Sequence, residues 1–278
     1  TALAVAVLGT QGAVALGWIG FGDHRFMASE LPVLAIVAGG LMFGAGMVLT
    51  RGCISRLTVL SGSGNLRALL VLLVFAVTAH AALKGVLAPL RTSLGSVTLG
   101  LDSAALPGSP LIWTALIVIG ALAVALRSGN RPVMLALAAL IGLLVPLAWV
   151  GTGYVLYDDF DPIAMESLSF TSPAAESMFY TVAASAIPAS FGTGLVGGVL
   201  VGALAAALLS GSFAWQSFES PRQTGRYMAG AVLMGLGGVL AGGCTVGAGL
   251  SGVPTLSVAA VLAILSIVAG GLVTDRAL

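Results

Sequence analysis

The side chains with the widest chemistry in this chain are its two cysteines, Cys53 and Cys244, and each directly follows a glycine. A thiol is a weak hydrogen-bond donor with a polarizable sulfur. A buried cysteine also serves simply as a small hydrophobe, and two cysteines can form a structural disulfide. A metal site is disfavoured, because no histidine or carboxylate stands close in sequence to complete four ligands. The surroundings of the cysteines therefore decide between these uses.

Each cysteine closes one copy of a repeated pattern. The stretch GGLMFGAGMVLTRGCIS at 39–55 aligns with GAVLMGLGGVLAGGCTV at 230–246, and Leu-Ser-Gly follows both copies, at 60–62 and 250–252. The identical pairs are Gly39/Gly230, Gly44/Gly235, Gly46/Gly237, Val48/Val239, Leu49/Leu240, Gly52/Gly243 and Cys53/Cys244. We predict one transmembrane domain over 1–278, built as a two-fold repeat with halves at about 31–126 and 176–273.

The Gly-Cys pairs are expected to break a helix. Glycine permits positive φ and close backbone approach, so a helix is expected to end at Gly52 and at Gly243 and to restart beyond them. The first N–H groups of a restarted helix are unpaired and bind anions together with the helix dipole. With a thiol beside them, such groups suit a soft, sulfur-containing anion. The expected binding residues are Cys53, Cys244, Gly52, Gly243, Ile54, Thr245 and Gly242.

Composition places these elements in a lipid bilayer. The chain is 58% hydrophobic and 8% charged, with a mean hydropathy of +1.10, whereas soluble domains are about 45–50% apolar and about 25% charged. Its 39 glycines suit closely packed transmembrane helices. A net charge of +1 without a basic cluster excludes nucleic acid as a partner. Because the chain begins at Thr1, we expect an N-terminal piece to be missing. Residues 2–20 lack a basic n-region and are interpreted as a span.

The positions of the helices follow from runs of about 20 apolar residues. Such runs lie at about 2–20, 31–50, 65–89, 110–126, 132–156, 176–190, 191–210, 225–241 and 254–273. The piece at 176–190 is short and contains Pro188, so we expect a half-span there. Paired, interrupted hydrophobic segments in two halves are typical of a transporter's binding site. The sequence thus predicts an all-α integral membrane protein of about nine transmembrane helices with short half-helices and an inverted repeat around a central Gly-Cys site.

Three further polar features each have two interpretations. His80 and Lys84 share one helix face, either as an intramembrane pair near a substrate path or as a satisfied histidine and a lysine that extends to the interface. Arg51 either attracts an anion or anchors the interface. The polar stretch ESLSFTSP at 166–173 is either a lid or a surface loop.

The motifs together resemble the YeeE/YedE membrane family, bacterial proteins associated with thiosulfate uptake. The resemblance rests on residues 39–55, on SGSGNL at 61–66, on 166–173 and on LMGLGGVLAGGCTVGAGLSG at 233–252. It covers nearly the whole chain, and the Gly-Cys motifs are its most specific part. It implies inverted-repeat helices around a waist and central cysteines, here Cys53 and Cys244, that contact the substrate transiently.

The chain departs from the family pattern in two respects. Arg51 stands where a small residue is expected before Gly52, and some members have a further cysteine near the N-terminus that this chain lacks. Some relatives are associated with selenium metabolism instead. The resemblance nevertheless implies a multi-pass transporter of the bacterial inner (plasma) membrane that imports thiosulfate, with no enzymatic activity and no cofactor. It also implies a cytoplasmic TusA-like sulfur-carrier protein as a partner.

Other functions remain open at this stage. The chain could transport another sulfur or selenium species, or anchor a sulfur carrier without transport. It could also be a membrane thiol redox protein, but that class needs an activating base or cation, and His24 and His80 are distant from both cysteines in sequence. ATP is not expected to drive transport, because the chain has no nucleotide-binding motif. The spans also offer no internal carboxylate as a site for a coupling ion.

Overall fold

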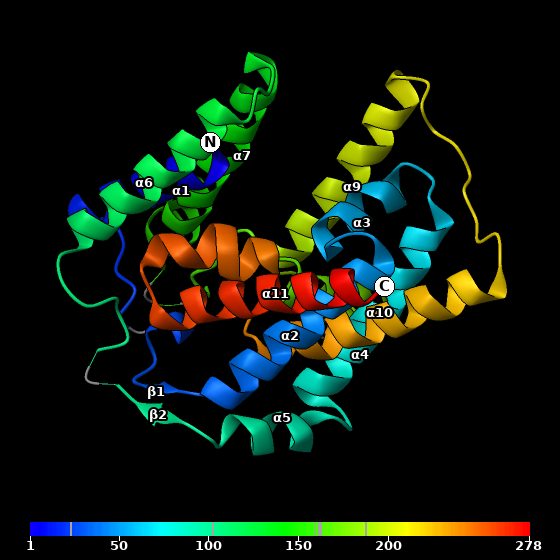
Figure 1. The fold of residues 1–278 in the computed structure, drawn as a ribbon, viewed down its shortest axis with the longest axis horizontal. Helices are drawn as coiled ribbons and strands as arrows, with labels where there is room; N and C mark the ends of the chain where they lie inside the picture. The colour runs from blue at the N-terminus through cyan, green and yellow to red at the C-terminus, as the bar shows by residue number, and fades with distance from the viewer. Residues whose placement is uncertain (23, 102, 159, 161–162, 187) are drawn as a thin grey trace. The chain divides into compact units, whose positions relative to one another are not determined.

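The structure is a computed structural model that describes residues 1–22, 24–101, 103–158, 160, 163–186 and 188–278. The described chain is predominantly helical (Figure 1). Its α-helices are α1 (Ala2–Ala15), α2 (Val33–Thr50), α3 (Ile54–Gly62), α4 (Leu66–Lys84), α5 (Ala88–Gly95), α6 (Pro110–Arg127), α7 (Pro132–Val150), α8 (Thr171–Ala183), α9 (Phe191–Leu209), α10 (Pro221–Leu240) and α11 (Val258–Ala277).

Short elements connect these helices. Two are 3₁₀ turns, η1 (Arg25–Met27) and η4 (Val253–Thr255), and two are π-helical, η2 (Gly151–Val155) and η3 (Thr245–Gly252). The strands β1 (Glu30–Leu31) and β2 (Leu99–Gly100) pair antiparallel, with Glu30 opposite Gly100. This two-residue ladder leaves the predicted all-α class unchanged.

The prediction of an all-α integral membrane protein is confirmed. Within the described residues, seven helical segments are long and apolar enough to cross a membrane: Val33–Gly62, Leu66–Lys84, Pro110–Arg127, Pro132–Val155, Phe191–Leu209, Pro221–Thr255 and Val258–Ala277. The expected runs at 2–20 and 176–190 form α1 and α8, of 14 and 13 residues. At 1.5 Å per residue each reaches about 20 Å, less than the roughly 30 Å hydrocarbon core. Seven full-length candidates therefore replace the nine expected.

Apolar side chains on the outer helices suit a lipid environment. Leu111 and Leu126 on α6 are 79% and 81% exposed, and Leu209 on α9 is 90% exposed. Soluble proteins rarely expose large contiguous apolar surfaces. Acyl chains cover such surfaces without the cost that water would impose, so the lipid bilayer is the natural surroundings of these helices.

The chain forms two compact units. The first comprises Thr1–Leu31, Leu99–Leu168 and Val246–Val261, and the second comprises Pro32–Thr98, Ser169–Thr245 and Leu262–Leu278. These units are not the predicted repeat halves, and the assignment of 1–278 as one domain with two such halves stays a prediction.

In the first unit, α1 packs along α6 and α7. A Cβ built on Gly9 would lie 2.5 Å from Cγ of Pro146, so only glycine permits this approach. Trp149 at the end of α7 is 2% exposed. It meets the rings of Phe21 and His24 edge-on, with centroids 5.0 and 5.1 Å away, an arrangement that aromatic rings favour. The segment after α1 is thereby fixed to α7.

In the second unit, α10 is the central helix. It packs against α2 and α4, while α3 packs on α4 and α9, and α8 packs on the same two helices. Figure 1 shows α2 in blue beside α10 in orange. Both predicted Gly-Cys elements begin where one of these two helices ends.

Candidate substrate site at the two Gly-Cys turns

The first predicted helix break is present. Helix α2 ends at Thr50, Arg51 adopts a left-handed conformation (φ 60°), and Gly52 donates its N–H to the carbonyl of Met47 at 2.9 Å. Such a bond across a left-handed residue closes a helix C-terminus. Cys53 is extended (φ −72°, ψ 159°) and forms the N-cap of α3. The thiol therefore stands at the start of the restarted helix, as predicted.

The second break has the same form. Helix α10 ends at Leu240, Gly242 is left-handed (φ 75°), and Cys244 directly precedes the π-helical segment η3. Gly242 is the repeat equivalent of Arg51. In both copies the left-handed residue stands two positions before the cysteine.

This geometry corrects one expectation about the glycines. Gly52 and Gly243 were expected to supply the positive φ of the two turns. That φ belongs instead to Arg51 and to Gly242, one position earlier in each copy. A Cβ on Gly52 would lie 3.1 Å from Cδ of Arg56, the flexible part of a side chain. Left-handed backbone favours glycine because a Cβ approaches the following carbonyl. The departure noted at Arg51 thus places an arginine where the backbone favours glycine.

The matched glycines bring α2 and α10 together. A Cβ on Gly39 would lie 2.7 Å from the carbonyl oxygen of Gly237, and a Cβ on Gly46 would lie 2.6 Å from that of Gly230. The early residue of α2 meets the late residue of α10, so the two helices run antiparallel. Gly39 is the repeat mate of Gly230, and Gly46 that of Gly237. A two-fold operation therefore converts each contact into the other.

A second pair of matched glycines follows the same rule. A Cβ on Gly44 of α2 would collide with the carbonyl of Ile267 on α11. A Cβ on Gly235 of α10 would lie 2.9 Å from Cβ of Thr78 and 3.2 Å from the nitrogen of Ala79 on α4. The first helix of each copy thus packs on the last helix of the other copy.

The two cysteines meet between these helices. Because α2 and α10 are antiparallel, their C-terminal ends point in opposite directions, and the cysteines come together only because the chain reverses after each helix. The hydroxyl of Thr245 donates to Sγ of Cys53 at 2.9 Å, and the side chains of Cys53 and Cys244 are in hydrogen-bonding contact. Three predicted site residues are therefore in one place.

Burial distinguishes the site residues. Cys244 and Ile54 are fully buried, whereas Cys53 and Thr245 are partly exposed. Both cysteines are thiols and not a disulfide, so the disulfide alternative is excluded for this state. Among the described residues, no group of three or more histidine, cysteine or acidic side chains could hold a metal ion.

Ser55 is a neighbour that the sequence reasoning missed. Its backbone amide and hydroxyl approach the Cys53 sulfur. The Cys53 side chain nevertheless forms no capping hydrogen bond to the start of α3. Ser55 is the second residue of α3, where an N-cap side chain usually finds its donor. The sequence signal that could have identified Ser55 was the position of Cys53 directly before a predicted helix. The start of α3 therefore offers backbone N–H groups beside the thiol.

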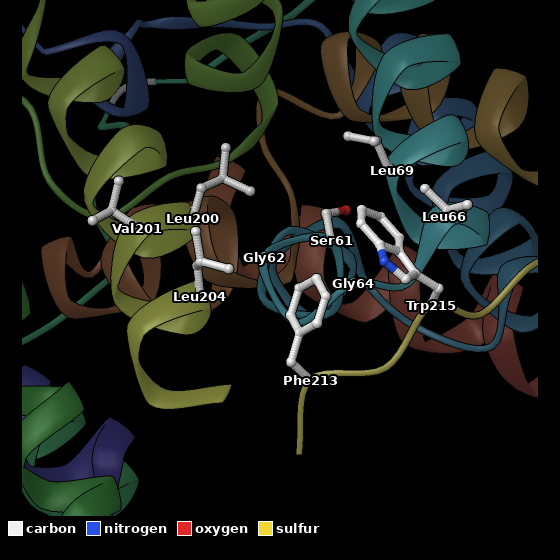
Figure 2. Close-up of a pocket in the computed structure, with 10 residues that line it drawn as sticks. All are labelled: Ser61, Gly62, Gly64, Leu66, Leu69, Leu200, Val201, Leu204, Phe213 and Trp215. Atoms are coloured by element: carbon white, nitrogen blue, oxygen red, sulfur yellow. The ribbon is translucent and has the colours of Figure 1, made fainter. Parts of the chain in front are cut away.

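A separate recess lies in the second unit beside α3 and α9 (Figure 2). Its volume is about 290 Å³, and leucine, valine and aromatic side chains dominate its walls. It is lined by Ser61, Gly62, Gly64, Leu66, Leu69, Leu200, Val201, Leu204, Phe213 and Trp215. An anion loses much hydration energy in such surroundings without regaining it. This recess is therefore not a site for the predicted substrate, and its lining includes neither cysteine.

The first residues of the stretch at 166–173 are packed against other segments, so this part is neither a free lid nor a surface loop. Ser167 donates its hydroxyl to the carbonyl of Val145 at 3.0 Å, and Ser251 donates to the carbonyl of Leu168 at 2.7 Å. Both hydroxyls are buried in these bonds. The stretch is a packed connection that leads into α8.

Comparison with known proteins identifies the class. A family model described as sulphur transport matches residues 1–273, so the chain belongs to that family, and the resemblance drawn from the motifs is confirmed. Two similar proteins carry the same name. The chain is 27% identical to the thiosulfate transporter TsuA of Escherichia coli (strain K12), over 81% of this chain and 69% of that protein. It is 26% identical to the thiosulfate transporter TsuA of Spirochaeta thermophila, over 86% and 76%.

Proposed function

We propose that this protein imports thiosulfate across the bacterial inner (plasma) membrane through the two Gly-Cys turns. The observation that carries the proposal is the meeting of Cys53, Cys244 and Thr245 at the start of α3. The membership in a sulphur transport family and the names of the two relatives support it. The self-complementary packing of α2 and α10 supports the inverted repeat.

The turn at Cys53 supplies complementary groups for a dianion with a soft terminal sulfur. The unpaired N–H groups at the start of α3 attract the oxygen atoms. Thr245 occupies an acceptor position of the Cys53 sulfur, so the S–H of Cys53 is available to donate to the passing anion. Cys53 is the more exposed thiol and meets the anion before Cys244 does. Gly52, Gly242, Gly243 and Ile54 shape the backbone around these groups.

The anion passes without chemical conversion in this proposal. A thiol reaction needs a base or cation that activates the cysteine. Among the described residues, Cys53 has hydrogen-bonding contacts with Thr245, Cys244 and Ser55, which are neutral groups. Hydrogen bonds release the substrate quickly, whereas a covalent bond would not. The protein therefore acts as a transporter and not as an enzyme.

Transport of a dianion into a negatively charged cytoplasm needs a driving force. The cost is about 2.3 kcal/mol per charge per 100 mV, so roughly 5 kcal/mol for two charges at that potential. Consumption of thiosulfate by a cytoplasmic sulfur carrier of the TusA type would keep its internal concentration low. We include such a carrier as a proposed partner, tested by whether its deletion lowers steady-state uptake.

Uptake of radiolabelled thiosulfate tests the proposal. Cells without other thiosulfate importers would express the wild type, Cys53→Ser, Cys244→Ser or the control Ser61→Ala, which changes a small polar residue on α3 away from the cysteines. We expect both serine variants to lose about tenfold or more in uptake, about 1.4 kcal/mol, because a hydroxyl is a harder group than a thiol. Ser61→Ala should match the wild type at equal membrane expression.

The same assay separates the alternatives. Uptake that continues in the presence of a reducing agent supports transport by free thiols. A protein that acts by thiol redox chemistry would lose its activity under the same conditions. Normal uptake by both serine variants would show that the cysteines are packing residues. Preferential competition by selenium-containing or other sulfur oxyanions over unlabelled thiosulfate would assign a different substrate.

A further inference from the structure

The first Gly-Cys turn carries two arginines to which the proposed function gives no role. Arg51 and Arg56 are the charged residues of the candidate span Val33–Gly62, and both are exposed. Ionisable residues inside such segments are rare and commonly mark the route of a polar substrate. Among the described residues, neither arginine has a carboxylate partner. Two positive charges at this turn are therefore uncompensated.

Arg56 lies directly over the turn. Its Nη1 donates to the carbonyl oxygen of Arg51 at 2.8 Å, and its Cδ would lie 3.1 Å from a Cβ on Gly52. Gly52 immediately precedes Cys53, so the charge is held within two residues of the partly exposed thiol. A guanidinium has five N–H donors, so the bond to the carbonyl leaves others available for an anion.

The carbonyl oxygens of this turn face donors of the protein itself. The Arg51 carbonyl accepts from Arg56. The Gly52 carbonyl accepts from the hydroxyl of Thr50 at 3.0 Å, and Thr50 shares this hydroxyl with the carbonyl of Gly46 at 2.9 Å. Unsatisfied carbonyls at the end of a helix carry partial negative charge and repel an anion. With both carbonyls engaged, the turn presents donors and positive charge.

The backbone at residue 51 does not call for arginine. Arg51 is left-handed (φ 60°), a conformation that is unfavourable for a residue with a Cβ. Gly242 makes the same reversal in the second copy without a side chain. Strained backbone of this kind is concentrated at functional sites. What arginine supplies here, and glycine would not, is a positive charge.

The second turn lacks these charges. The segment GGCTVGAGLSG at 242–252 contains no charged residue. Cys244 is fully buried, whereas Cys53 is partly exposed. Two turns of the same backbone form thus differ in charge and in access, and both differences direct an anion to the first turn before the second.

We propose that Arg51 and Arg56 form the capture site for thiosulfate, from which the anion passes to Cys53 and then to Cys244. The planar guanidinium matches the oxygen atoms of an oxyanion, and its charge replaces hydration that the dianion loses in the span. The neutral second turn holds the anion less strongly, so the anion can leave. The inference rests on the proposed function and adds two binding residues to it.

Uptake measured over a range of thiosulfate concentrations tests the capture site. Arg56→Gln and Arg51→Asn each remove one charge, and asparagine tolerates a left-handed backbone. We expect each to raise the transport KM about fivefold and to leave the maximal rate within about twofold, because a charge at an entrance acts mainly on encounter. Arg56→Lys keeps the charge and should retain most of the affinity. The matched control Arg67→Gln removes an arginine that already pairs with Glu219 and should leave KM unchanged.

Arg51→Gly separates capture from a structural role. Glycine relieves the left-handed strain, so its melting temperature in detergent should equal or exceed that of the wild type. Isothermal titration should nevertheless show thiosulfate binding about fivefold weaker. Added sodium chloride should weaken this binding less than in the wild type, because salt screens exposed charges. This variant also decides the test if Arg56→Gln does not fold.

The outcomes distinguish the capture site from the proposed function. Unchanged KM in Arg56→Gln and Arg51→Asn, with wild-type uptake intact, overturns the capture site and leaves the proposed function standing. Equal loss of maximal rate in Arg56→Lys and Arg56→Gln would assign Arg56 to holding the turn and overturn its part in capture. No binding and no uptake of thiosulfate by the wild type overturns the proposed function, and the capture site with it.

Discussion

At the scale of single residues, the hydroxyl of Thr245 donates a hydrogen bond to the Cys53 sulfur at 2.9 Å. The two residues belong to different copies of the repeat. This bond fixes the rotamer of a thiol that is only partly buried. Thr245 is therefore expected to matter for binding as much through orientation as through direct contact with the anion.

Replacement of Thr245 by valine tests this role. Valine preserves the branched shape and removes the donor, so we expect thiosulfate affinity to fall about fivefold, the equivalent of one ordinary hydrogen bond of about 1 kcal/mol. Thr245→Ser keeps the hydroxyl and should retain most of the affinity. Isothermal titration of purified protein measures both. Equal affinities for the two variants would show that the hydroxyl plays no part.

At the scale of elements, the two turns place their strain differently. Arg51 adopts a left-handed backbone conformation, which is unfavourable for a residue with a Cβ. Its counterpart Gly242 has no Cβ and adopts the same conformation without this cost. A Cβ on Gly242 would meet no atom within 4 Å. An alanine there would therefore report backbone strain alone, without any clash.

Gly242→Ala should destabilise the protein by about 1–2 kcal/mol, the cost of a left-handed conformation for a residue with a Cβ. Gly52→Ala is the control within the first turn, because its φ is not left-handed and its new Cβ meets only the flexible Arg56 side chain. Thermal unfolding in detergent compares them. A melting temperature for Gly242→Ala equal to that of Gly52→Ala would contradict the assignment of strain.

The helix pair itself depends on glycine at the contact between α2 and α10. Gly46→Ala would place a Cβ 2.6 Å from the Gly230 carbonyl oxygen, and overpacking of this kind costs about 1–3 kcal/mol. Gly198→Ala on α9 makes the same change where no atom lies within 4 Å. We expect a lower yield and melting temperature for Gly46→Ala only, measured by size-exclusion chromatography and thermal unfolding. Equal behaviour of the two variants would argue against close packing.

At the scale of the whole molecule, stability should depend on pH through His24. This residue lies outside the candidate spans and accepts the N–H of Phe26 at Nδ1, at 3.3 Å. Burial, and secondarily the charge of Arg25, lowers the pKa of His24 from 6.5 to about 4. The folded protein therefore keeps the imidazole neutral where the unfolded chain already binds a proton.

The direction of the effect follows from this difference. As the pH falls from about 6.5 to 4, the unfolded state binds more protons than the folded state, and the free energy of unfolding decreases. Above pH 6.5 the contribution of His24 is constant. Melting temperatures across this window should fall more steeply for the wild type than for His24→Gln. A wild-type curve parallel to that of His24→Gln would contradict the prediction.

The sequence by itself determined the class of protein and the places where its helices break. Apolar segments long enough to cross a bilayer are stable in lipid and not in water, and in lipid they must form helices. Composition alone therefore predicts membrane helices. The repeated Gly-Cys pattern predicted the breaks at Cys53 and Cys244, because it depends on local backbone chemistry. Its two copies also carried the family resemblance.

Only the tertiary structure decided which groups meet. The contact of Thr245 with Cys53 and the stacking of His80 on Phe179 join residues far apart in the chain, and no local pattern specifies them. Both depend on which helices pack together and on where α8 begins. The left-handed residue of the first turn is also a tertiary result. Local preference favours glycine there, yet the close packing of α2 on α10 determines where α2 ends and thereby places Arg51 at the reversal.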